Sequence, residues 1–337
     1  MINGDNLYIV EEFPRSFLIE TSGKSFKTPF FVPAVSSLVK TNLKILEYID
    51  LLKKVGYPGF LISAYDIDRL QNKEEKVLLE DFSDFAEKRK LIFLDNGNYE
   101  AYWYSDQKWI LKNLERVLEK ISPDFCFSFD IFWDENKNVE KYIKETITSI
   151  AKTAGIQKTG ETIALIHSNP KLFPKVARKI VDYINPEIIA IPERELGPSI
   201  FERSQTIKAV RDELNKTEKP IAIHVLGTGH PVSILIYTLC GADIYDAYTW
   251  YSECINPETG HFLHFSQRDL VDCHCEACKL EKVPYNFQTM THNLMFYLDF
   301  LDKIREAIRN ESIEKILAEY IRKKDVSIVK KIGGLDE

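Results

Sequence analysis

The sequence predicts an α/β fold in which eight parallel strands close into a (β/α)₈ barrel. Eight short apolar, β-rich runs alternate with longer amphipathic stretches, and strands that alternate with helices typically form a parallel sheet. The chain has 337 residues, and about 250 residues suffice for a barrel of this kind. An open doubly wound sheet is the alternative, but no G-x-G-x-x-G motif follows an early strand.

The expected strands and helices follow one another in regular order. The strands span residues 29–35, 59–64, 91–94, 125–129, 163–166, 187–191, 221–226 and 243–248. The covering helices include residues 42–54, 108–120, 138–153, 171–184, 201–216 and 231–240. No low-complexity linker interrupts this alternation.

Composition restricts the class of protein. Hydrophobic residues make up 45% and charged residues 28% of the chain, as in folded rather than disordered proteins. No apolar run approaches the roughly 20 residues of a membrane span, and the first residues lack the pattern of a secretory signal, so we expect a cytoplasmic protein. The formal charge of −7 argues against coating nucleic acid through overall charge, although a local basic groove remains compatible with it.

A cysteine cluster near the C-terminal end predicts a metal site. Cys273, Cys275 and Cys278 lie within six residues, and His292 follows in the segment THNL. Three thiolates and one imidazole complete the tetrahedral shell of a structural Zn²⁺ ion. His274 is a competing ligand, but it adjoins two cysteines and would strain the loop. Three cysteines without a ligand role are the remaining alternative.

These motifs divide the expected fold into two parts. Residues 1–270 form the α/β (TIM) barrel, and residues 271–337 form a zinc-binding segment with C-terminal helices packed on the barrel. His292 opens a helical pattern of apolar residues that runs to residue 308, so its side chain can face back toward the cysteine loop.

Polar residues at the strand ends indicate an enzyme. The functional side chains of such barrels lie at the C-terminal ends of the strands. Those ends carry Ser63, Tyr65, Asp95, Asp130, His167, Glu193, Gly227 and Asp246. A single acid there could be a helix N-cap, but the whole ring is typical of a catalytic mouth. Asp243, at the start of its strand, should lie away from it.

Two of these acids suit covalent catalysis. Asp95 precedes a tight turn and an aromatic residue in the segment LDNGNYE, and Asp246 ends the strand that follows the HVLGTG turn. Two carboxylates on different strands that face one mouth can serve as a nucleophile and a separate acid/base.

Five ordered segments resemble one enzyme family. They are TPFFVPAVSSLVK, FLDNGNYE, FCFSFD, HVLGTGHP…GADIYD and the CxCxxC…THNL ending, and they run from about Thr28 to Tyr297. Together they resemble the tRNA-guanine transglycosylase superfamily. The resemblance implies a zinc-bearing (β/α)₈ barrel and a glycosyltransferase that exchanges a guanine in nucleic acid for a 7-deazaguanine.

The resemblance also implies a role for each matching residue. Asp246 matches the nucleophile that attacks the sugar C1′ and forms a covalent glycosyl-enzyme. Asp95 matches the acid/base that assists departure of the base and then activates the incoming 7-deazaguanine. Tyr99 matches the aromatic residue that stacks on the base, and Asp130 matches an acid that contacts its Watson–Crick edge.

Other matching positions line the base pocket or depart from the family pattern. Gly227 and Gly229 match a glycine turn that lines the pocket. Glu193, together with Pro192, replaces a glycine pair that presents backbone groups to the base, and His167 replaces a glutamine at the end of the fifth strand. We expect His167 and Glu193 to contact the substrate.

Further departures from the family pattern concern which nucleic acid is the substrate. The segment AYTWYSE after Asp246 contains no arginine, whereas tRNA-modifying members read flanking bases with arginines there. The loop from Cys278 to His292 is shorter than in typical bacterial tRNA enzymes, and we expect no RNA-binding C-terminal domain like that of archaeal members. These departures favour the DpdA-type branch, DNA transglycosylases that insert 7-cyano-7-deazaguanine into DNA.

Three alternatives remain. The first is a transglycosylase that acts on tRNA, the second a noncatalytic partner subunit of a transglycosylase, and the third a nucleoside hydrolase of the same fold. The presence of both Asp95 and Asp246 argues against the second. The expected partners are a nucleic acid and a free 7-deazaguanine base, and not a membrane. A homodimer and an accessory DNA-opening ATPase are both compatible with the sequence.

Without the arginines, affinity should come from phosphate contacts. The candidates are Lys171, Lys175, Arg178 and Lys179 on one helix, with Arg322, Lys323, Lys324, Lys330 and Lys331 in the tail. A solvated helix face is the alternative for each group.

Overall fold

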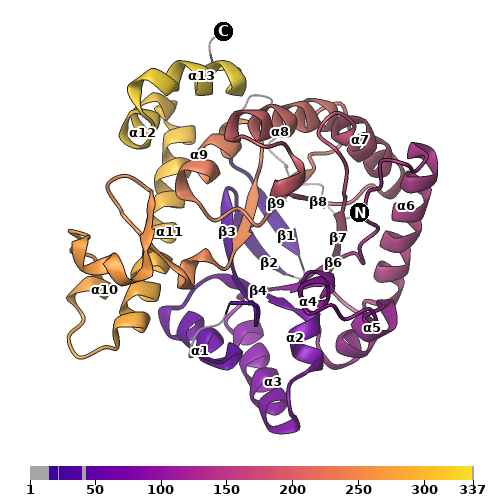
Figure 1. Cartoon of the computed structure of the whole chain (residues 1–337), viewed down its shortest axis with the longest axis horizontal. Coiled ribbons are helices and arrows are strands. Elements are labelled where there is room, and N and C mark those ends of the chain that lie inside the picture. Colours follow the sequence, from indigo (N-terminus) through magenta and orange to yellow (C-terminus); the bar gives the residue numbers. More distant parts are fainter. Residues whose placement is uncertain (1–14, 22, 40–42, 336–337) are drawn as a thin grey trace, which may run out of the picture.

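A closed barrel of eight parallel strands forms the centre of the molecule (Figure 1). The computed structural model describes residues 15–21, 23–39 and 43–335. The barrel strands are β3 (Phe30–Val35), β4 (Gly59–Ser63), β5 (Leu91–Asp95), β6 (Phe125–Phe127), β7 (Glu161–Leu165), β8 (Ile188–Pro192), β9 (Ala222–Leu226) and β10 (Ile244–Ala247). β10 closes the barrel because Ile244 pairs with both Phe30 and His224. The predicted fold is confirmed, and the predicted strands match these elements to within a few residues.

Eight helices cover the barrel. They are α1 (Ile45–Val55), α3 (Asn72–Glu87), α5 (Leu111–Lys120), α6 (Val139–Ile156), α7 (Phe173–Ile184), α8 (Ile200–Leu214), α9 (Pro231–Leu239) and α11 (Tyr285–Arg309). All six predicted helices are found, although the one predicted over 42–54 starts at a residue outside the described part. α11 begins at Tyr285, seven residues before the start of the apolar pattern that predicted it at His292. The pattern did not reveal these first two turns because their residues are largely polar or aromatic.

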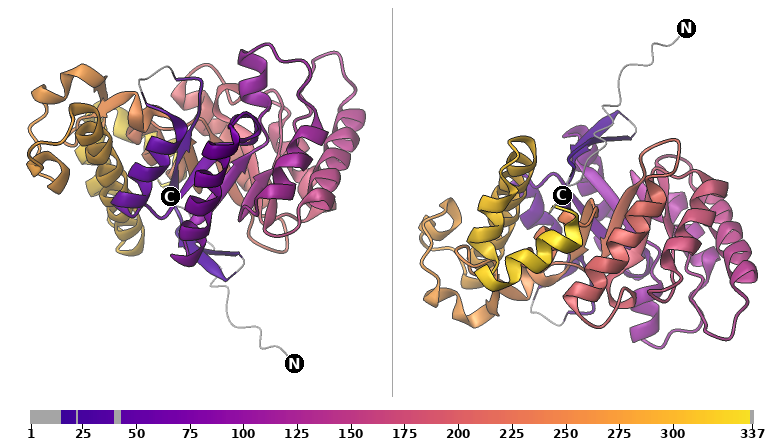
Figure 2. Two further views of the ribbon diagram at one scale, coloured as in Figure 1. Left: turned by 90° about the horizontal axis from the view of Figure 1, so that it is seen from below. Right: turned by 90° about the horizontal axis from the view of Figure 1, so that it is seen from above.

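Apolar side chains fill the interior of the barrel. Alternate positions of the strands contribute to one buried cluster, with Phe93, Phe125 and Phe127 among its largest members. A hairpin that the sequence did not predict, β1 (Leu18–Thr21) and β2 (Lys24–Lys27), lies at one end of the barrel (Figure 2). Its Phe26 ring lies 4.7 Å from that of Phe30 and 6.0 Å from that of Phe125, between ring centroids. The hairpin therefore closes the N-terminal end and leaves the opposite end for the site.

Shorter elements lie in the connections and in the C-terminal region. They are α2 (Ala64–Asp68), α4 (Asn98–Trp103), η1 (Glu193–Glu195), η2 (Thr249–Tyr251), β11 (Glu253–Ile255), β12 (Phe262–His264), η3 (Phe265–Leu270), α10 (Glu276–Lys279), α12 (Ile313–Tyr320) and α13 (Lys323–Gly333). The C-terminal region lies on one side of the barrel, and α11 joins it to the ring by packing on α1, α9 and β3 (Figure 1).

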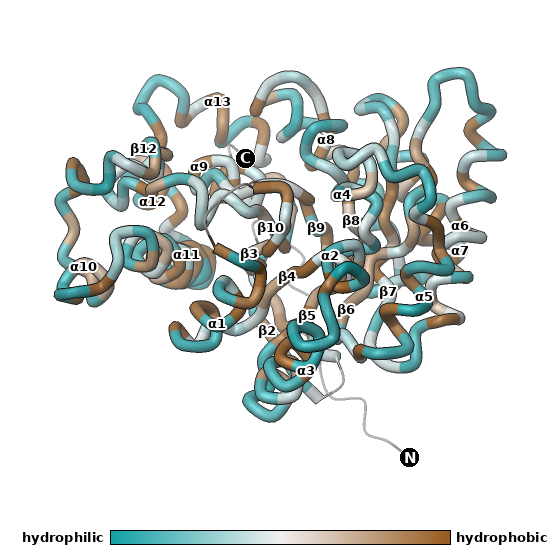
Figure 3. Tube along the Cα trace, turned by 60° about the horizontal axis from the view of Figure 1, so that its bottom comes forward, coloured by the Kyte–Doolittle hydropathy of each residue, from teal (hydrophilic) through white to brown (hydrophobic). Residues whose placement is uncertain are grey.

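Hydropathy follows the same arrangement. The central strands are predominantly hydrophobic, while the outer helices carry hydrophilic stretches (Figure 3). Among the helices of the described residues, none has both the length and the apolar character needed to span a membrane.

A buried ion pair lies at the start of β10, away from the residues that line the main cavity. Asp243 Oδ2 accepts hydrogen bonds from Arg211 Nη2 at 2.5 Å and from the Ile223 backbone N–H at 2.8 Å. Arg211 is fully buried and also donates to the carbonyl oxygens of Gly241 and Ile221. Burial lowers the pKa of Arg211 to about 9, although Asp243 acts in the opposite direction. Asp243 is thus a structural acid, as its position in the sequence predicted.

Removing this carboxylate should destabilise the fold. Asp243→Asn leaves the buried Arg211 without its counter-charge, so we expect the free energy of unfolding to fall by about 3–5 kcal/mol. Urea denaturation measures this change. Asp246→Asn, the same substitution at the other end of the strand, is the matched control and should unfold near the wild-type midpoint. Equal midpoints for the two variants would contradict the assignment.

Candidate active site

A cavity of about 560 Å³ opens at the C-terminal end of the barrel. Its wall includes the predicted residues Asp95, Tyr99, Asp130, His167, Glu193, Gly227 and Asp246. They come from six different strand ends and are far apart in the sequence, so the closed barrel is what brings them together.

The interior alternation of the strands explains which side chains reach this cavity. Phe93, Leu165 and Ile244 belong to the interior cluster of the barrel. Two residues further along the chain lie Asp95, His167 and Asp246, of which His167 lies just beyond the end of its strand. Because side chains alternate between the two faces of a strand, these polar groups continue the interior face beyond the apolar layers. The cavity is therefore floored by the barrel core.

Asp246 is held from the neighbouring strand. Its Oδ1 accepts a hydrogen bond from His224 Nε2 at 2.9 Å and one from the Gly227 backbone N–H at 3.3 Å. Gly227 has a φ of +80°, a conformation that favours glycine. The turn after β9 therefore directs a backbone donor at the carboxylate.

Gly229 has a different place from the one predicted. It is absent from the cavity wall, and a Cβ atom there would lie 2.1 Å from Thr249 Oγ1 and 2.6 Å from Ala247 Cβ. Its carbonyl oxygen accepts a hydrogen bond from Tyr297 Oη at 2.5 Å. In this structure Gly229 permits close packing between the ends of β9 and β10, whereas Gly227 lines the pocket.

Asp95 ends β5 and starts a tight turn. Its Oδ2 accepts a hydrogen bond from the Gly97 backbone N–H at 2.9 Å, and Gly97 has a φ of +90°. Burial raises the pKa of Asp95 well above its usual range, and the nearby carboxyl groups of Glu100, Asp130 and Asp246 raise it further. This environment favours the protonated carboxyl group that a general acid needs.

His167 lies between two carboxylates. Its Nε2 is 2.7 Å from Asp130 Oδ1, and its Nδ1 is 2.8 Å from Glu195 Oε1. Burial alone would lower the pKa of His167, but the two carboxylates outweigh this effect and raise it to about 9. The ring is therefore an imidazolium at neutral pH that donates to both acids. His167 lines the cavity and also positions Asp130, and its expected contact with the substrate stays a prediction.

Glu193 is also engaged by neighbouring side chains. Its Oε1 accepts hydrogen bonds from Arg203 Nη1 at 3.0 Å and from Tyr237 Oη at 2.9 Å. The next residue, Arg194, lines the cavity, and its guanidinium carbon lies 5.8 Å from the ring centroid of Tyr99. The loop after β8 thus brings a cation to the aromatic residue predicted to stack on the base.

Exposed aromatic side chains surround the cavity. Tyr99 is 37%, Tyr102 69% and Phe132 50% exposed, and all three line the wall. Trp103, next to Tyr102 on α4, is 58% exposed. Large aromatic rings are normally covered in a folded protein, so this cavity rim offers apolar ring faces to a ligand.

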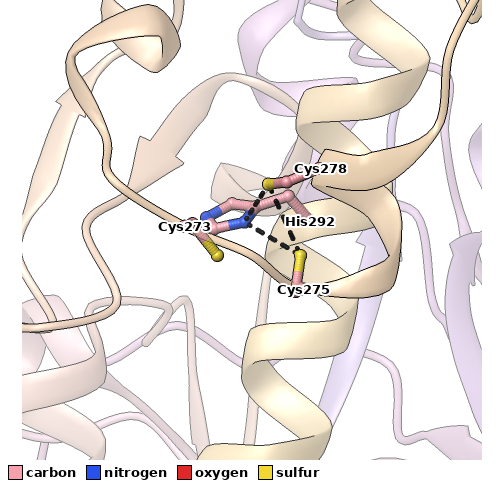
Figure 4. A group of neighbouring side chains, drawn as sticks. All are labelled: Cys273, Cys275, Cys278 and His292. Atoms are coloured by element: carbon pink, nitrogen blue, oxygen red, sulfur yellow. Dashed lines mark hydrogen bonds between the residues drawn. The ribbon is translucent and has the colours of Figure 1, made fainter.

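The predicted cysteine cluster converges on one point (Figure 4). The ligand atoms of Cys273, Cys275, Cys278 and His292 all lie within 4.8 Å of one another. His292 Nδ1 lies 3.6 Å from Cys275 Sγ and 3.4 Å from Cys278 Sγ. His292 Nε2 lies 2.9 Å from the carbonyl oxygen of Ile255. Because Nε2 donates its hydrogen to this oxygen, Nδ1 is the nitrogen that can bind a metal ion. The group could hold a metal ion, and His274 is not part of it.

Comparison with known proteins places the sequence in one family. Residues 12–325 match the family model described as queuine tRNA-ribosyltransferase. The chain belongs to this family. The resemblance to the tRNA-guanine transglycosylase superfamily is therefore confirmed, and the homologues of this family are named as glycosyl-transferring enzymes.

Three archaeal relatives, each named tRNA-guanine(15) transglycosylase, show the extent of the similarity. The Methanococcus aeolicus protein is 22% identical over 335 residues, which cover 90% of this chain and 50% of the relative. The Methanosphaera stadtmanae protein is 22% identical over 319 residues, covering 87% and 46%. The Nanoarchaeum equitans protein is 22% identical over 317 residues, covering 88% and 72%. The chain thus spans about half the length of the first two relatives.

Some residues of this transglycosylase-family site were not assigned from the sequence. They are His224, Glu100, Glu195 and Arg194. Glu100 accepts hydrogen bonds from Ser36 Oγ at 2.7 Å and Ser63 Oγ at 2.6 Å, and burial raises its pKa to about 7. The sequence signal for Glu100 was an acid within the DNGNYE segment, and the signal for His224 was a polar residue at an interior position of its strand.

The basic candidates for phosphate contacts are in part engaged within the transglycosylase fold. Arg178 pairs with Asp182 at 2.6 Å, Lys179 with Glu140, Arg322 with Asp325 at 2.6 Å and Lys330 with Glu314 at 2.6 Å. These pairs fit the alternative of solvated helix faces.

The imidazolium of His167 should make stability depend on pH. Its pKa is raised to about 9 in the folded chain and is about 6.5 when unfolded. The stabilisation is therefore fully present below about pH 6.5 and is lost as the pH rises through about 9. Between pH 7 and 10 the free energy of unfolding of the wild type should fall more than that of His167→Gln, by on the order of 3 kcal/mol. Parallel pH profiles in urea denaturation would contradict this.

Proposed function

We propose that the chain exchanges a guanine base of tRNA for a free 7-deazaguanine through a covalent glycosyl-aspartate. The observation that carries this proposal is the pair of carboxyl groups, Asp95 and Asp246, that open into one cavity from different strands in a chain of this family. Neither group alone would support base exchange, which needs both a nucleophile and an acid/base.

The proposed reaction has two displacement steps at C1′. An oxygen of Asp246 attacks C1′ of the target nucleotide, the bond from C1′ to N9 of guanine breaks, and Asp95 gives its proton to the departing base. Asp95, now a carboxylate, then takes a proton from the incoming base, whose nitrogen attacks C1′ and displaces Asp246. The high pKa of Asp95 suits the first step, and a carboxylate stabilises the oxocarbenium-like transition state of both.

The cavity supports binding of a single unstacked base. Asp130 is held through Oδ1 by His167, which leaves its other oxygen to accept hydrogen bonds from the N–H groups of a guanine edge. Tyr99 and the other aromatic side chains of the rim offer ring faces that can replace the stacking lost when a nucleotide leaves its neighbours.

The choice of tRNA rests on the relatives. DNA was the main expectation from the sequence and tRNA its alternative. The relatives are named tRNA-guanine(15) transglycosylases, and they support the alternative better. The segment that lacks arginines has a structural role here, because Trp250 Nε1 donates to the Ala34 carbonyl and Tyr251 Oη to the Ser36 carbonyl. DNA therefore becomes the competing outcome of the experiment.

Base exchange with labelled guanine tests the proposal. Wild-type protein is incubated with an unmodified tRNA transcript, duplex DNA or single-stranded DNA, and label in each polymer is counted. We expect label in tRNA, and a denaturation-resistant protein–tRNA adduct that Asp246→Asn abolishes. Asp95→Asn, the matched change at the acid/base, should lower exchange strongly because it cannot donate a proton to the base.

Each other outcome overturns part of the proposal. Label in DNA alone would replace tRNA by DNA, and release of free base without an acceptor base would indicate a nucleoside hydrolase. Wild-type protein that labels no polymer and forms no adduct would overturn the transglycosylase assignment and favour a noncatalytic subunit.

The cysteine cluster is proposed to hold a structural Zn²⁺ ion. Three soft thiolates and one imidazole fill four tetrahedral positions and leave none open for catalysis. The hydrogen bond from His292 Nε2 to the Ile255 carbonyl is the second-sphere contact that orients a metal-bound histidine. The ion would tie the loop before α10 to α11 and to β11.

Metal analysis and thermal unfolding test the zinc site. Cys275→Ser should reduce the bound zinc measured by elemental analysis and lower the melting temperature, because metal binding contributes to folding. His274→Ala, which removes an exposed neighbour outside the cluster, should keep both values near those of the wild type. Unchanged zinc content in Cys275→Ser would contradict the assignment.

A further inference from the structure

We infer that His224 is a positioning residue that holds Oδ1 of Asp246 and leaves Oδ2 as the oxygen that attacks C1′. This inference rests on the proposed function and extends it to a residue and an atom. It follows from four features of the structure: the place of His224 in the barrel, its tautomer, the hydrogen bonds to Asp246 and the position of Asp246 in the cavity wall.

His224 is a polar side chain in an apolar layer of the barrel. It is the third residue of β9 and is fully buried. The centroid of its ring lies 5.2 Å from that of Phe127 and 6.2 Å from that of Phe93. A buried polar group costs free energy unless it is hydrogen-bonded. An apolar residue would fill this place at lower cost, so the contact with Asp246 is what distinguishes histidine here.

The surroundings determine the tautomer of His224. Its Nε2 lies 2.9 Å from Asp246 Oδ1, and because a carboxylate oxygen accepts, Nε2 must carry the hydrogen. Nδ1 is buried and has no hydrogen-bond partner among the described residues. A hydrogen on Nδ1 would be an unpaired donor among aromatic rings, so the ring is the neutral Nε2–H tautomer. His224 thus orients the carboxylate without cancelling its negative charge.

Both hydrogen bonds from described residues to the Asp246 side chain end on the same oxygen. His224 Nε2 and the Gly227 backbone N–H approach Oδ1, and both belong to β9 or the turn directly after it. Two donors on one oxygen fix the rotation of the carboxyl group. Asp246 lines the cavity, so Oδ2 is the oxygen available to the sugar.

This arrangement serves both displacement steps. When Oδ2 bonds to C1′, Oδ1 becomes the carbonyl oxygen of the glycosyl ester and keeps its donors. When the incoming base attacks C1′, the bond from C1′ to Oδ2 breaks and its electron pair returns to the carboxylate. The donors then stabilise the negative charge that develops, as preorganised hydrogen bonds do at other developing anions.

Two substitutions at His224 separate positioning from packing. His224→Phe keeps an aromatic ring in the layer of Phe93 and Phe127 but removes the donor. His224→Gln places an amide N–H near the position of Nε2 and restores a donor. Single-turnover formation of the covalent adduct is measured with the polymer that the wild type labels, together with kcat, KM and the melting temperature.

We expect His224→Phe to slow adduct formation and lower kcat by about 10- to 100-fold, with KM for the polymer and for the free base close to wild type. His224→Gln should recover most of the loss. Wild-type rates in His224→Phe would overturn the inference, and so would equal losses in both variants accompanied by a lower melting temperature, which indicate a packing role. A wild-type protein without adduct would overturn the proposed function itself, and this inference with it.

Discussion

The closed pairing of the barrel strands is the constraint on which the site depends. Because β10 pairs with both β9 and β3, every strand has a defined interior face, and side chains alternate along it. The interior apolar layers and the hairpin with Phe26 fill the barrel up to the level of the strand ends. The next interior positions border the cavity, and the sequence places Asp95, His167 and Asp246 there. The cavity begins where the apolar core ends.

Acidic groups crowd this layer, and their partners differ. Asp246 accepts from a neutral imidazole and a backbone N–H, whereas Asp130 accepts from the imidazolium of His167. Asp95 has the hydrogen bond from Gly97 N–H, and burial among other carboxyl groups raises its pKa. When neighbouring carboxyl groups have different surroundings in this way, the same side-chain chemistry can supply both an acid and a nucleophile.

The sequence predicted the barrel well because apolar strands and amphipathic helices alternate without interruption. Six of the strand ends identified a residue of the cavity wall, whereas Ser63 and Tyr65, at another strand end, are not among the residues that line it. The sequence did not predict His224, because this polar residue lies inside a strand and not at its end. Its interior position, two residues after the core residue Ala222, was the available signal. Glu195 was not found because its role depends on the distance to His167 across two strand ends. The motif predicted that Gly229 lines the pocket. The sequence could not show its close packing against Ala247 and Thr249, because these residues are distant from it in the chain.

The cluster of Cys273, Cys275, Cys278 and His292 is connected to the surroundings of Asp246 through α11. His292 contacts the Ile255 carbonyl, and the next residue, Asn293, is fully buried. Its side chain donates to the carbonyl oxygens of Trp250 and Glu253 and accepts from the Ile255 backbone N–H. One turn further, Tyr297 donates to the carbonyl of Gly229. α11 thereby fixes the backbone that follows Asp246 and the turn that supplies one of its donors. A metal ion that anchors the N-terminal half of α11 would therefore affect the position of Asp246, although it lies outside the cavity.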